Sequence, residues 1–500
     1  MEIFRKMSFA DSTGDAIPFY HDGVYHIFSL TPPVGTTVYP ERLRTTWSHA
    51  VSKDLIHWEE LPTAIYPGEG KEPDASGVWT GSVLYGEGKY HAFYTGYSIK
   101  AEYQQTICHA YSEDGINWKK DTGNPVIKPL IDQYEQQDFR DPYVFFNEDE
   151  KKYWMLVSAR RLDMPVTRRG CIVLYRSTDL ESWEYYGNLY SPGHTNCPEC
   201  SEIYKMKDTW ILSYSRFSEF GNTIYRTAKS PYGPWKKMKK DGIGGRRFYA
   251  AKSLTDKNGR RIYFAWAHDR GQCSDKGEWY WGGRFCIPHE VKLSETGDLL
   301  VDIPQEFTES IHKTIPWNYL PVLGEYKRYG AESIVLDALE TTGYGFLMHD
   351  KKRFYFHASI IPKEANDSFG ILLKSDKEAS ECLFLEFDVA MQRVSLLSLP
   401  MGVDPFWEQS CQAVPEASSP GPDGFRVSEK TFSIKTGAVI DVKIFVDHDM
   451  IEVFIGKEIA FTYRVYRSSE YEIGIIAQDS KVEYANIALC DYTSNIFDIL

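Results

Sequence analysis

The chain has 500 residues, of which 70 are Asp or Glu and 56 are Lys or Arg, so its formal net charge is −14. Because one hydrophobic core stops growing well below this length, two domains are expected. The negative charge excludes the usual binders of nucleic acids and anionic membranes, which need clustered basic residues, and favours a neutral or weakly charged small molecule or oligosaccharide.

The first residues of the chain and its cysteines bear on the cellular compartment in which the protein is expected. Residues 1–6 contain no apolar h-region, so no secretory signal is expected, and no apolar stretch approaches the roughly 18 residues of a membrane span. The nine cysteines follow no disulfide framework. We therefore expect reduced thiols and a cytoplasmic protein.

A repeat runs through the first 290 residues. The pattern Ser-x-Asp-x-x-x-Trp begins at Ser52, Ser112 and Ser177, and a shortened version runs from Ser230 to Trp235. The gaps between these starts are 60, 65 and 53 residues, which accommodates about four short strands with their turns. Each repeat is therefore interpreted as one blade of a β-propeller.

A second repeated element, a turn followed by an aromatic strand, gives the number of blades. It occurs over 22–28, 88–94, 152–156, 208–212 and 259–264. Turn residues followed by alternating aromatic positions are typical of β-hairpins, and convincing amphipathic helices are missing. The sequence predicts an all-β chain with a five-bladed β-propeller over residues 1–302.

Beyond the propeller the pattern changes. A linker is predicted over 303–327, where Pro304, Pro316 and Pro321 lie between two β-rich regions. Residues 328–500 are predicted to form a β-sandwich, because longer strands alternate with polar turns and no repeat of blade length is present. The expected strands are 354–361, 382–389, 442–446, 451–455 and 459–465, with a loop over 404–426.

Three acidic residues stand in short motifs beside predicted strands: Asp15, Asp141 and Glu199. The inner strands of a propeller converge on a central funnel, so acids from different blades can meet at one end of its axis. Two such carboxylates, one attacking and one donating a proton, are the chemistry of a glycosidase. The three acids are therefore the candidate catalytic residues.

Their neighbours suggest different tasks. A nucleophile must remain ionised, and the apolar Ala16 and Ile17 that follow Asp15 would limit competition from solvent. Arg140 precedes Asp141 and would keep that carboxylate charged and oriented toward sugar hydroxyls. Glu199 has few basic neighbours, and a less polar pocket would raise its pKa toward the range of a general acid.

No metal or organic cofactor is expected. The pair Cys197 and Cys200 has Cys-x-x-Cys spacing, but it lacks a second pair and a nearby His-x-x-x-His, so zinc or redox use is not predicted.

Several motifs together give a resemblance to glycoside hydrolase family 32, the β-fructofuranosidases. Segment 47–62 is similar to the family's first-blade signature, and Val78-Trp79-Thr80-Gly81-Ser82 resembles its Phe-Ser-Gly-Ser element. The further matching segments are Arg140-Asp141-Pro142, Glu199-Cys200, 248–252 with 259–261, and 451–455 with 464–466. These matches cover nearly the whole chain.

The resemblance implies a five-bladed propeller joined to a β-sandwich, and retaining hydrolysis of terminal β-fructofuranosyl bonds in sucrose or fructo-oligosaccharides. It implies that Asp15 attacks the anomeric carbon, that Glu199 protonates the leaving oxygen, and that Asp141 holds fructose hydroxyls. The expected substrate-binding residues are Arg140, Trp47, Trp79 and Thr80. No cofactor is implied, and the exposed faces of the sandwich leave room for a homodimer.

The first motif departs from the family. Where the family has Trp-Met-Asn-Asp-Pro-Asn-Gly, this chain has residues 11–18, and a gap-free alignment puts the family's Asp at Gly14. Because Asp15 then needs a shift of one residue, Asp11 is an alternative nucleophile.

The spacing from Asp15 to Asp22 suits the related family 43, whose members invert and act on arabinose or xylose. A glycosidase or fructosyltransferase for another furanoside, and an inactive carbohydrate-binding relative, remain alternatives.

Overall fold

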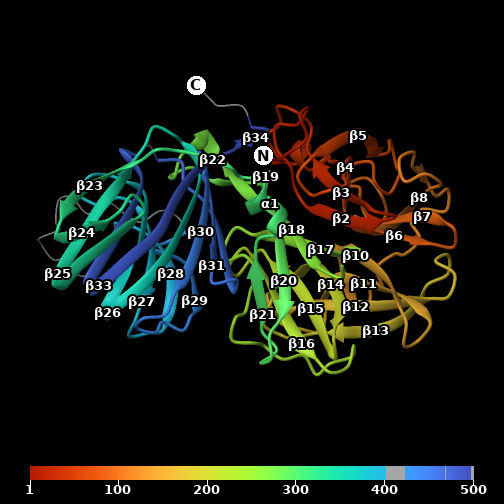
Figure 1. Ribbon diagram of the computed structural model, residues 1–500. Helices are drawn as coiled ribbons and strands as arrows, with labels where there is room; N and C mark the ends of the chain where they lie inside the picture. Colours follow the sequence, from red (N-terminus) through yellow and green to blue (C-terminus); the bar gives the residue numbers. More distant parts are fainter. Residues whose placement is uncertain (401–422, 468, 497–500) are drawn as a thin grey trace, which may run out of the picture. The chain divides into compact units, whose positions relative to one another are not determined.

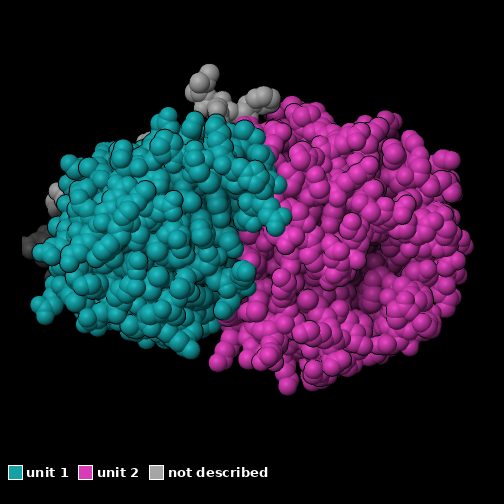
Figure 2. Space-filling model, viewed as in Figure 1, with its two compact units in different colours: residues 1, 270–279, 308–493 teal, residues 2–269, 280–307, 494–500 magenta. Residues whose placement is uncertain are grey.

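The computed structural model describes residues 1–400, 423–467 and 469–496. The chain forms two compact units, drawn in two colours in Figure 2. One contains Glu2–Asp269, Tyr280–Phe307 and Ser494–Leu500, and the other contains Met1, Arg270–Trp279 and Thr308–Thr493. In the described part of the chain, no helix is long and apolar enough to cross a membrane.

The first unit is a propeller of five antiparallel blades (Figure 1). Blade 1 consists of β2 (Ala16–His21), β3 (Val24–Thr31), β4 (Thr46–Ser52) and β5 (Trp58–Ile65). Blade 2 consists of β6 (Gly77–Gly86), β7 (Lys89–Tyr97), β8 (Gln105–Ser112) and β9 (Lys119–Lys120). Blade 3 consists of β10 (Tyr134–Asn147), β11 (Lys152–Arg161), β12 (Gly170–Ser177) and β13 (Glu184–Tyr190).

The last two blades differ in strand number. Blade 4 has three strands, β14 (Pro198–Met206), β15 (Thr209–Arg216) and β16 (Asn222–Ala228). Blade 5 has five, β17 (Tyr249–Thr255), β18 (Arg261–Arg270), β19 (Trp279–Phe285), β20 (His289–Leu293) and β21 (Leu299–Asp302). Each of the five predicted aromatic strands corresponds to the second strand of a blade, so the predicted propeller is confirmed.

The innermost strands β2, β6, β10, β14 and β17 form a closed ring, because each contacts the next and β17 contacts β2. The repeated Trp helps to join the blades. Trp118 of blade 2 packs edge-on against Phe28 of blade 1, and Trp183 of blade 3 packs in the same way against Phe93 of blade 2. The sequence repeat thus contributes a large aromatic contact between consecutive blades.

The Asp of the same repeat closes a turn in each of the first three blades. Oδ1 of Asp54, Asp114 and Asp179 accepts hydrogen bonds from the backbone N–H groups two and three residues later, at 2.8 to 3.0 Å. These bonds satisfy amide donors that the strand ladder leaves unpaired, which is why the repeat carries an Asp there.

Among its described residues, the second unit contains a single hydrogen-bonded network of strands. The long strands β25 (Ser333–Met348), β26 (Arg353–Ser375) and β33 (Tyr471–Asp491) run through it, and the ladder between β26 and β33 is interrupted by register shifts. The other strands are β22 (Lys313–Thr314), β23 (Asn318–Leu323), β24 (Glu325–Tyr329), β27 (Leu383–Asp388), β28 (Arg393–Ser398), β29 (Arg426–Thr431), β30 (Ile440–Asp447), β31 (Met450–Ile455) and β32 (Ile459–Arg464).

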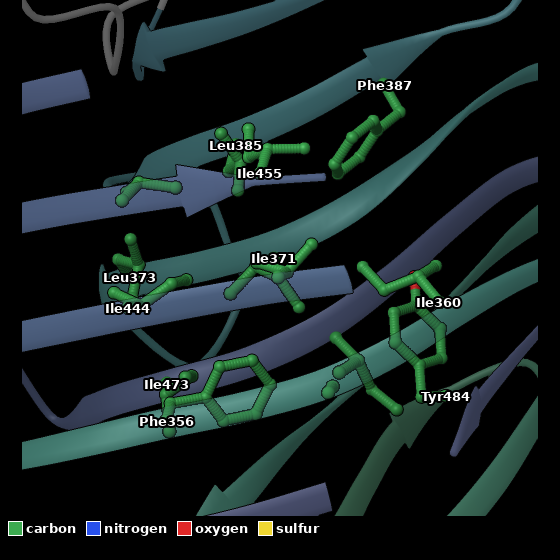
Figure 3. Packing of buried hydrophobic residues seen from close by; sticks show 14 of the residues in the cluster. Phe356, Ile360, Ile371, Leu373, Leu385, Phe387, Ile444, Ile455, Ile473 and Tyr484 are labelled. Atoms are coloured by element: carbon green, nitrogen blue, oxygen red, sulfur yellow. The ribbon is translucent and has the colours of Figure 1, made fainter. Parts of the chain in front are cut away.

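Bends in the long strands let one sheet fold over on itself, so that its apolar faces meet. Figure 3 shows Phe356, Ile371 and Leu385 pointing into this core together with Ile444 and Ile473. The predicted β-sandwich is confirmed. The predicted strand 354–361 proves to be the beginning of the much longer β26.

Helical structure is minor among the described residues. The α-helix α1 (Gln305–Glu309) has five residues, and the short 3-10 helices cover Glu41–Leu43, Val166–Arg168 and Gly271–Cys273. Helix α1, β22, β23 and the beginning of β24 fall within the expected linker 303–327. The domain boundaries stay a prediction. A loop was expected over 404–426, and its residues 404–422 lie outside the described residues.

Candidate active site

The inner strands of blades 3, 4 and 5 carry a β-bulge at the same place. The ladder with the second strand shifts register directly after Arg140, Glu199 and Tyr249. The residue that follows has a positive φ in all three blades: 59° at Asp141, 52° at Cys200 and 50° at Ala250. Such bulges turn side chains out of the ladder, and here they turn them toward the centre of the ring.

Asp15 precedes β2 and is 9% exposed. One carboxylate oxygen accepts a 2.8 Å hydrogen bond from Nε1 of Trp266, and the other accepts the hydroxyl of Thr80 and, at 3.5 Å, the thiol of Cys200. The pKa of Asp15 is raised, because burial and the nearby Glu199 outweigh the three donors, which stabilise the ionised form. Asp15 is thus a buried carboxylate with its charge supported by three donors from three blades.

Neither alternative in the first motif can supply this carboxylate. A Cβ placed on Gly14 would lie 2.5 Å from the ring of Trp281, so position 14 accommodates no side chain without moving the Trp. Asp11 is exposed and accepts a 2.5 Å hydrogen bond from the backbone of Gly35. Among the acids of the first motif, it is the Asp15 carboxylate that meets the other two predicted acids.

Asp141 lies deeper and is 3% exposed. Its Oδ2 accepts a 2.9 Å hydrogen bond from the backbone N–H of Cys200, and its own N–H donates to the hydroxyl of Thr95 at 2.8 Å. Burial raises the pKa of Asp141, the Arg140 guanidinium lowers it, and the nearby Asp15 raises it further. The ionised form of Asp141 therefore depends on the cations around it.

Glu199 is held from two sides. Nη2 of Arg140 donates a 2.8 Å hydrogen bond to Oε1, and the hydroxyl of Tyr249 donates to Oε2. Burial raises the pKa of Glu199, Arg140 lowers it and Asp141 raises it. With 20% of its side chain exposed, Glu199 is more open to solvent than the other two acids, whose side chains are buried. A carboxyl with a raised pKa at an accessible position suits a proton donor.

The predicted pocket residues take different places. Thr80 contacts Asp15 directly. Trp79 is half-buried, stacks on Tyr97 with ring centroids 4.1 Å apart, and donates a 3.0 Å hydrogen bond from Nε1 to the carbonyl of Leu43. Trp47 is fully buried, and its Nε1 donates a 2.9 Å hydrogen bond to the carbonyl of Trp79. Contrary to expectation, the buried Trp47 offers no surface to a sugar and instead supports Trp79.

Blade 5 contributes an aromatic wall to which the sequence alone assigned no role. The rings of Tyr249, Trp266 and His268 pack together, with centroids 4.3 to 5.7 Å apart, and Trp281 lies 5.7 Å from Trp266. Segment 248–252 is one of the family-like motifs. Its Tyr could have been found only by aligning the bulges, which requires knowing the strand register.

The described ranges 1–400, 423–467 and 469–496 contain no group of three or more His, Cys, Asp or Glu side chains placed to hold a metal ion. Cys197 and Cys200 are free and buried.

Family models match along most of the chain. The model of the glycosyl hydrolases family 32 N-terminal domain matches residues 15–304, and that of the family 32 C terminal region matches residues 331–491. The chain belongs to glycosyl hydrolase family 32. The first match begins at Asp15 and contains all three acids.

Curated relatives agree with this membership. A region of 329 residues is 31% identical to the β-fructofuranosidase insoluble isoenzyme CWINV2 of Arabidopsis thaliana, covering 59% of this chain and 53% of that protein. The levanase of Bacillus subtilis is 29% identical, with 59% and 45% covered. The match thus spans about half the length of these two relatives. The extracellular exo-inulinase of Aspergillus awamori is 25% identical over 90% of this chain and 86% of its own.

Solved structures share the fold of both units. Fructan 1-exohydrolase IIa from Cichorium intybus has a TM-score of 0.72 at 19% identity, with 99% of this chain and 97% of that chain covered. Sucrose-6-phosphate hydrolase from Lactobacillus gasseri has a TM-score of 0.71 at 19% identity, with 97% and 91% covered.

Proposed function

We propose that this family 32 protein is a retaining glycoside hydrolase that releases fructose from terminal β-fructofuranosyl bonds of sucrose or fructo-oligosaccharides. The observation that carries the proposal is the contrast between two acids of one buried cluster. Burial raises the pKa of both carboxyls, but Asp15 is enclosed and receives three hydrogen bonds, whereas Glu199 has 20% of its side chain exposed. An enclosed carboxylate beside a more accessible one suits a nucleophile paired with a general acid.

In the first step an Asp15 oxygen attacks C2 of the fructosyl unit while Glu199 donates its proton to the glycosidic oxygen. The bond from C2 to that oxygen breaks, the leaving alcohol departs, and a fructosyl ester of Asp15 remains. In the second step Glu199, now ionised, removes a proton from water as the water oxygen attacks C2. Free fructose leaves with its configuration retained, and Asp15 is again a carboxylate.

Asp141 and Arg140 would hold the fructosyl hydroxyls during both steps. Arg140 is 7% exposed and touches both Glu199 and Asp141, the latter at 3.9 Å from Nε to Oδ2. A buried carboxylate that accepts hydrogen bonds from sugar hydroxyls stabilises the positive charge that develops on the ring at the transition state.

The direct test is incubation with sucrose, short inulin-type oligosaccharides and levan, followed by measurement of free fructose. In the presence of methanol, retention predicts a methyl β-fructofuranoside as the first product. Asp15→Asn is the matched control and should release no fructose. Release of arabinose from an arabinofuranoside, or transfer products without free fructose, would favour the alternative furanoside enzymes. Binding without turnover of any substrate would overturn the proposal.

A further inference from the structure

A buried lysine extends from one inner strand of the propeller to two others. Lys252 belongs to β17, two residues beyond the bulge at Ala250, and is 1% exposed. Its ammonium donates a hydrogen bond to the carbonyl of Gly81 on β6. In the ring, β2 separates β17 from β6, so the side chain reaches across the axis. The ammonium also lies 5.6 Å from the ring centroid of Tyr143 on β10.

The groups around this ammonium come from three other inner strands. Gly81 on β6 directly follows Thr80, Tyr143 on β10 lies two residues after Asp141, and β14 contributes Cys200 and Glu202. Arg261 of β18 approaches Glu202 at 3.6 Å from Nη2 to Oε2, so Glu202 already has its own cation.

Burial of the Lys252 ammonium lowers the stability of the fold, because the charge loses its hydration and gains only one hydrogen bond, to a carbonyl. A neutral side chain could fill the same space at lower cost. The charge therefore requires another reason, and the nearby Asp141 carboxylate supplies one.

We propose that Lys252 is a positioning residue whose buried charge, held beside the β10 bulge that carries Asp141, keeps Asp141 ionised for catalysis. Burial and the neighbouring Asp15 raise the pKa of Asp141, whereas Arg140 and, more weakly, Lys252 lower it. Arg140 is shared with Glu199 and Asp138, while Lys252 forms no ion pair of its own within 4 Å among the described residues. The part of this inference that concerns catalytic rate rests on the proposed function.

Three variants separate charge from packing. Lys252→Met keeps the volume and removes both the charge and the donor, Lys252→Gln keeps an amide donor without the charge, and Lys252→Arg keeps the charge. Because loss of the cation raises the pKa of Asp141, the acidic limb of the kcat/KM profile should move up by about one pH unit in the Met and Gln variants. Lys252→Arg should keep the wild-type limb.

A purely structural role predicts a different result. The variants would then unfold at lower temperature or lose activity equally at every pH, and the acidic limb would stay in place. An unshifted limb in folded Lys252→Gln overturns the inference. If Lys252→Met does not fold, the Gln variant still decides.

Infrared titration gives a readout that needs no turnover. The stretching band of a protonated carboxyl should appear at a higher pH in Lys252→Gln than in the wild type, and the difference should vanish when both carry Asp141→Asn. An unchanged band overturns the inference even in an active fructosidase. A shifted band in a protein that cleaves no fructoside supports the inference while the proposed function fails.

Discussion

Arg140 and Glu199 occupy equivalent positions in neighbouring blades, and a 2.8 Å hydrogen bond from Nη2 to Oε1 joins them. The equivalent position in blade 5 is Tyr249, whose hydroxyl donates to the other oxygen of Glu199. One structural position, repeated around the ring, thus provides a carboxyl and the two donors that orient it. Both oxygens are fixed, so the carboxyl plane is set before a substrate binds.

Replacing Glu199 by Ala should remove most activity on sucrose, because the leaving oxygen is no longer protonated. We expect a loss of about a hundredfold or more in kcat. An activated fructoside with a good leaving group needs no proton, so its cleavage should be partly restored. The measurement compares kcat on the two substrates, and equal loss on both would mean that another residue is the acid.

Asp15→Asn should abolish turnover while leaving the fold intact, because an amide cannot form the fructosyl ester. Asp11→Asn is the matched control, since Asp11 is exposed and bonded to the Gly35 backbone. We expect near wild-type kcat for that control and no detectable kcat for Asp15→Asn, with circular dichroism to verify folding. Activity lost in the control and kept in Asp15→Asn would reverse the assignment.

Tyr249→Phe tests the hydrogen bond to Glu199. The Tyr249 hydroxyl favours the ionised carboxylate and so lowers the pKa of Glu199. Without it that pKa rises, and the acid stays protonated to higher pH. The basic limb of the kcat/KM profile should therefore move up by about one pH unit. A limb that does not move would show that Tyr249 has no influence on the acid, and a limb that moves down would show that its hydroxyl favours the protonated form.

Thr80→Val removes a donor to Asp15 while keeping the side-chain volume. Burial raises the pKa of Asp15 and the Thr80 hydroxyl lowers it, so the variant should have a higher pKa at Asp15. The acidic limb of the kcat/KM profile reports the ionisation of the interacting Asp15 and Asp141 carboxyls together, so it should move up in this variant too. At a pH below that limb the rate should fall about tenfold for each pH unit by which the limb has moved. Because Thr80 does not contact Glu199 in the described structure, the basic limb should not change.

Asp114→Ala tests the turn of the sequence repeat. Hydrogen bonds from the backbone of Asn117 and its neighbours hold the pKa of Asp114 well below its usual range. By analogy with capping carboxylates, the substitution should lower the free energy of unfolding by about 1 kcal/mol at neutral pH. The folded-state pKa is depressed, so this contribution is present above the unfolded-state pKa and disappears as the pH falls through the folded value.

Chemical denaturation at pH 7 and at pH 3 measures both parts of that prediction. Glu113→Ala, an exposed neighbour outside the turn's hydrogen bonds, is the control and should change stability little. A difference between Asp114→Ala and wild type that grows as the pH falls would contradict the assignment.

Local signals predicted much of the fold. The turn Asp and the Trp of the repeat act within or between adjacent blades, so their spacing alone reveals blade length. The sandwich was predicted less completely, because β26 and β33 continue through bulges where the alternation of apolar residues breaks.

The three acids of the candidate site were predicted because each stands in a recognisable sequence motif. Its aromatic partners were not, because Trp266 meets Asp15 across 251 residues of chain, and only closure of the ring brings them together. For Trp47 the sequence predicted too much. Its motif suggested a residue that binds the sugar, yet its ring is buried and hydrogen-bonds to the carbonyl of Trp79.

Closure of the ring has a consequence for renaturation experiments. Each blade is built from one continuous stretch of chain, and β17 meets β2 only when the fifth blade docks on the first. A folding intermediate with four blades would have most of its sheet, and most of its far-ultraviolet dichroism, but Asp15 would lack Trp266 and Glu199 would lack Tyr249. During refolding, enzymatic turnover should therefore return only when the fifth blade docks on the first, later than the far-ultraviolet dichroism.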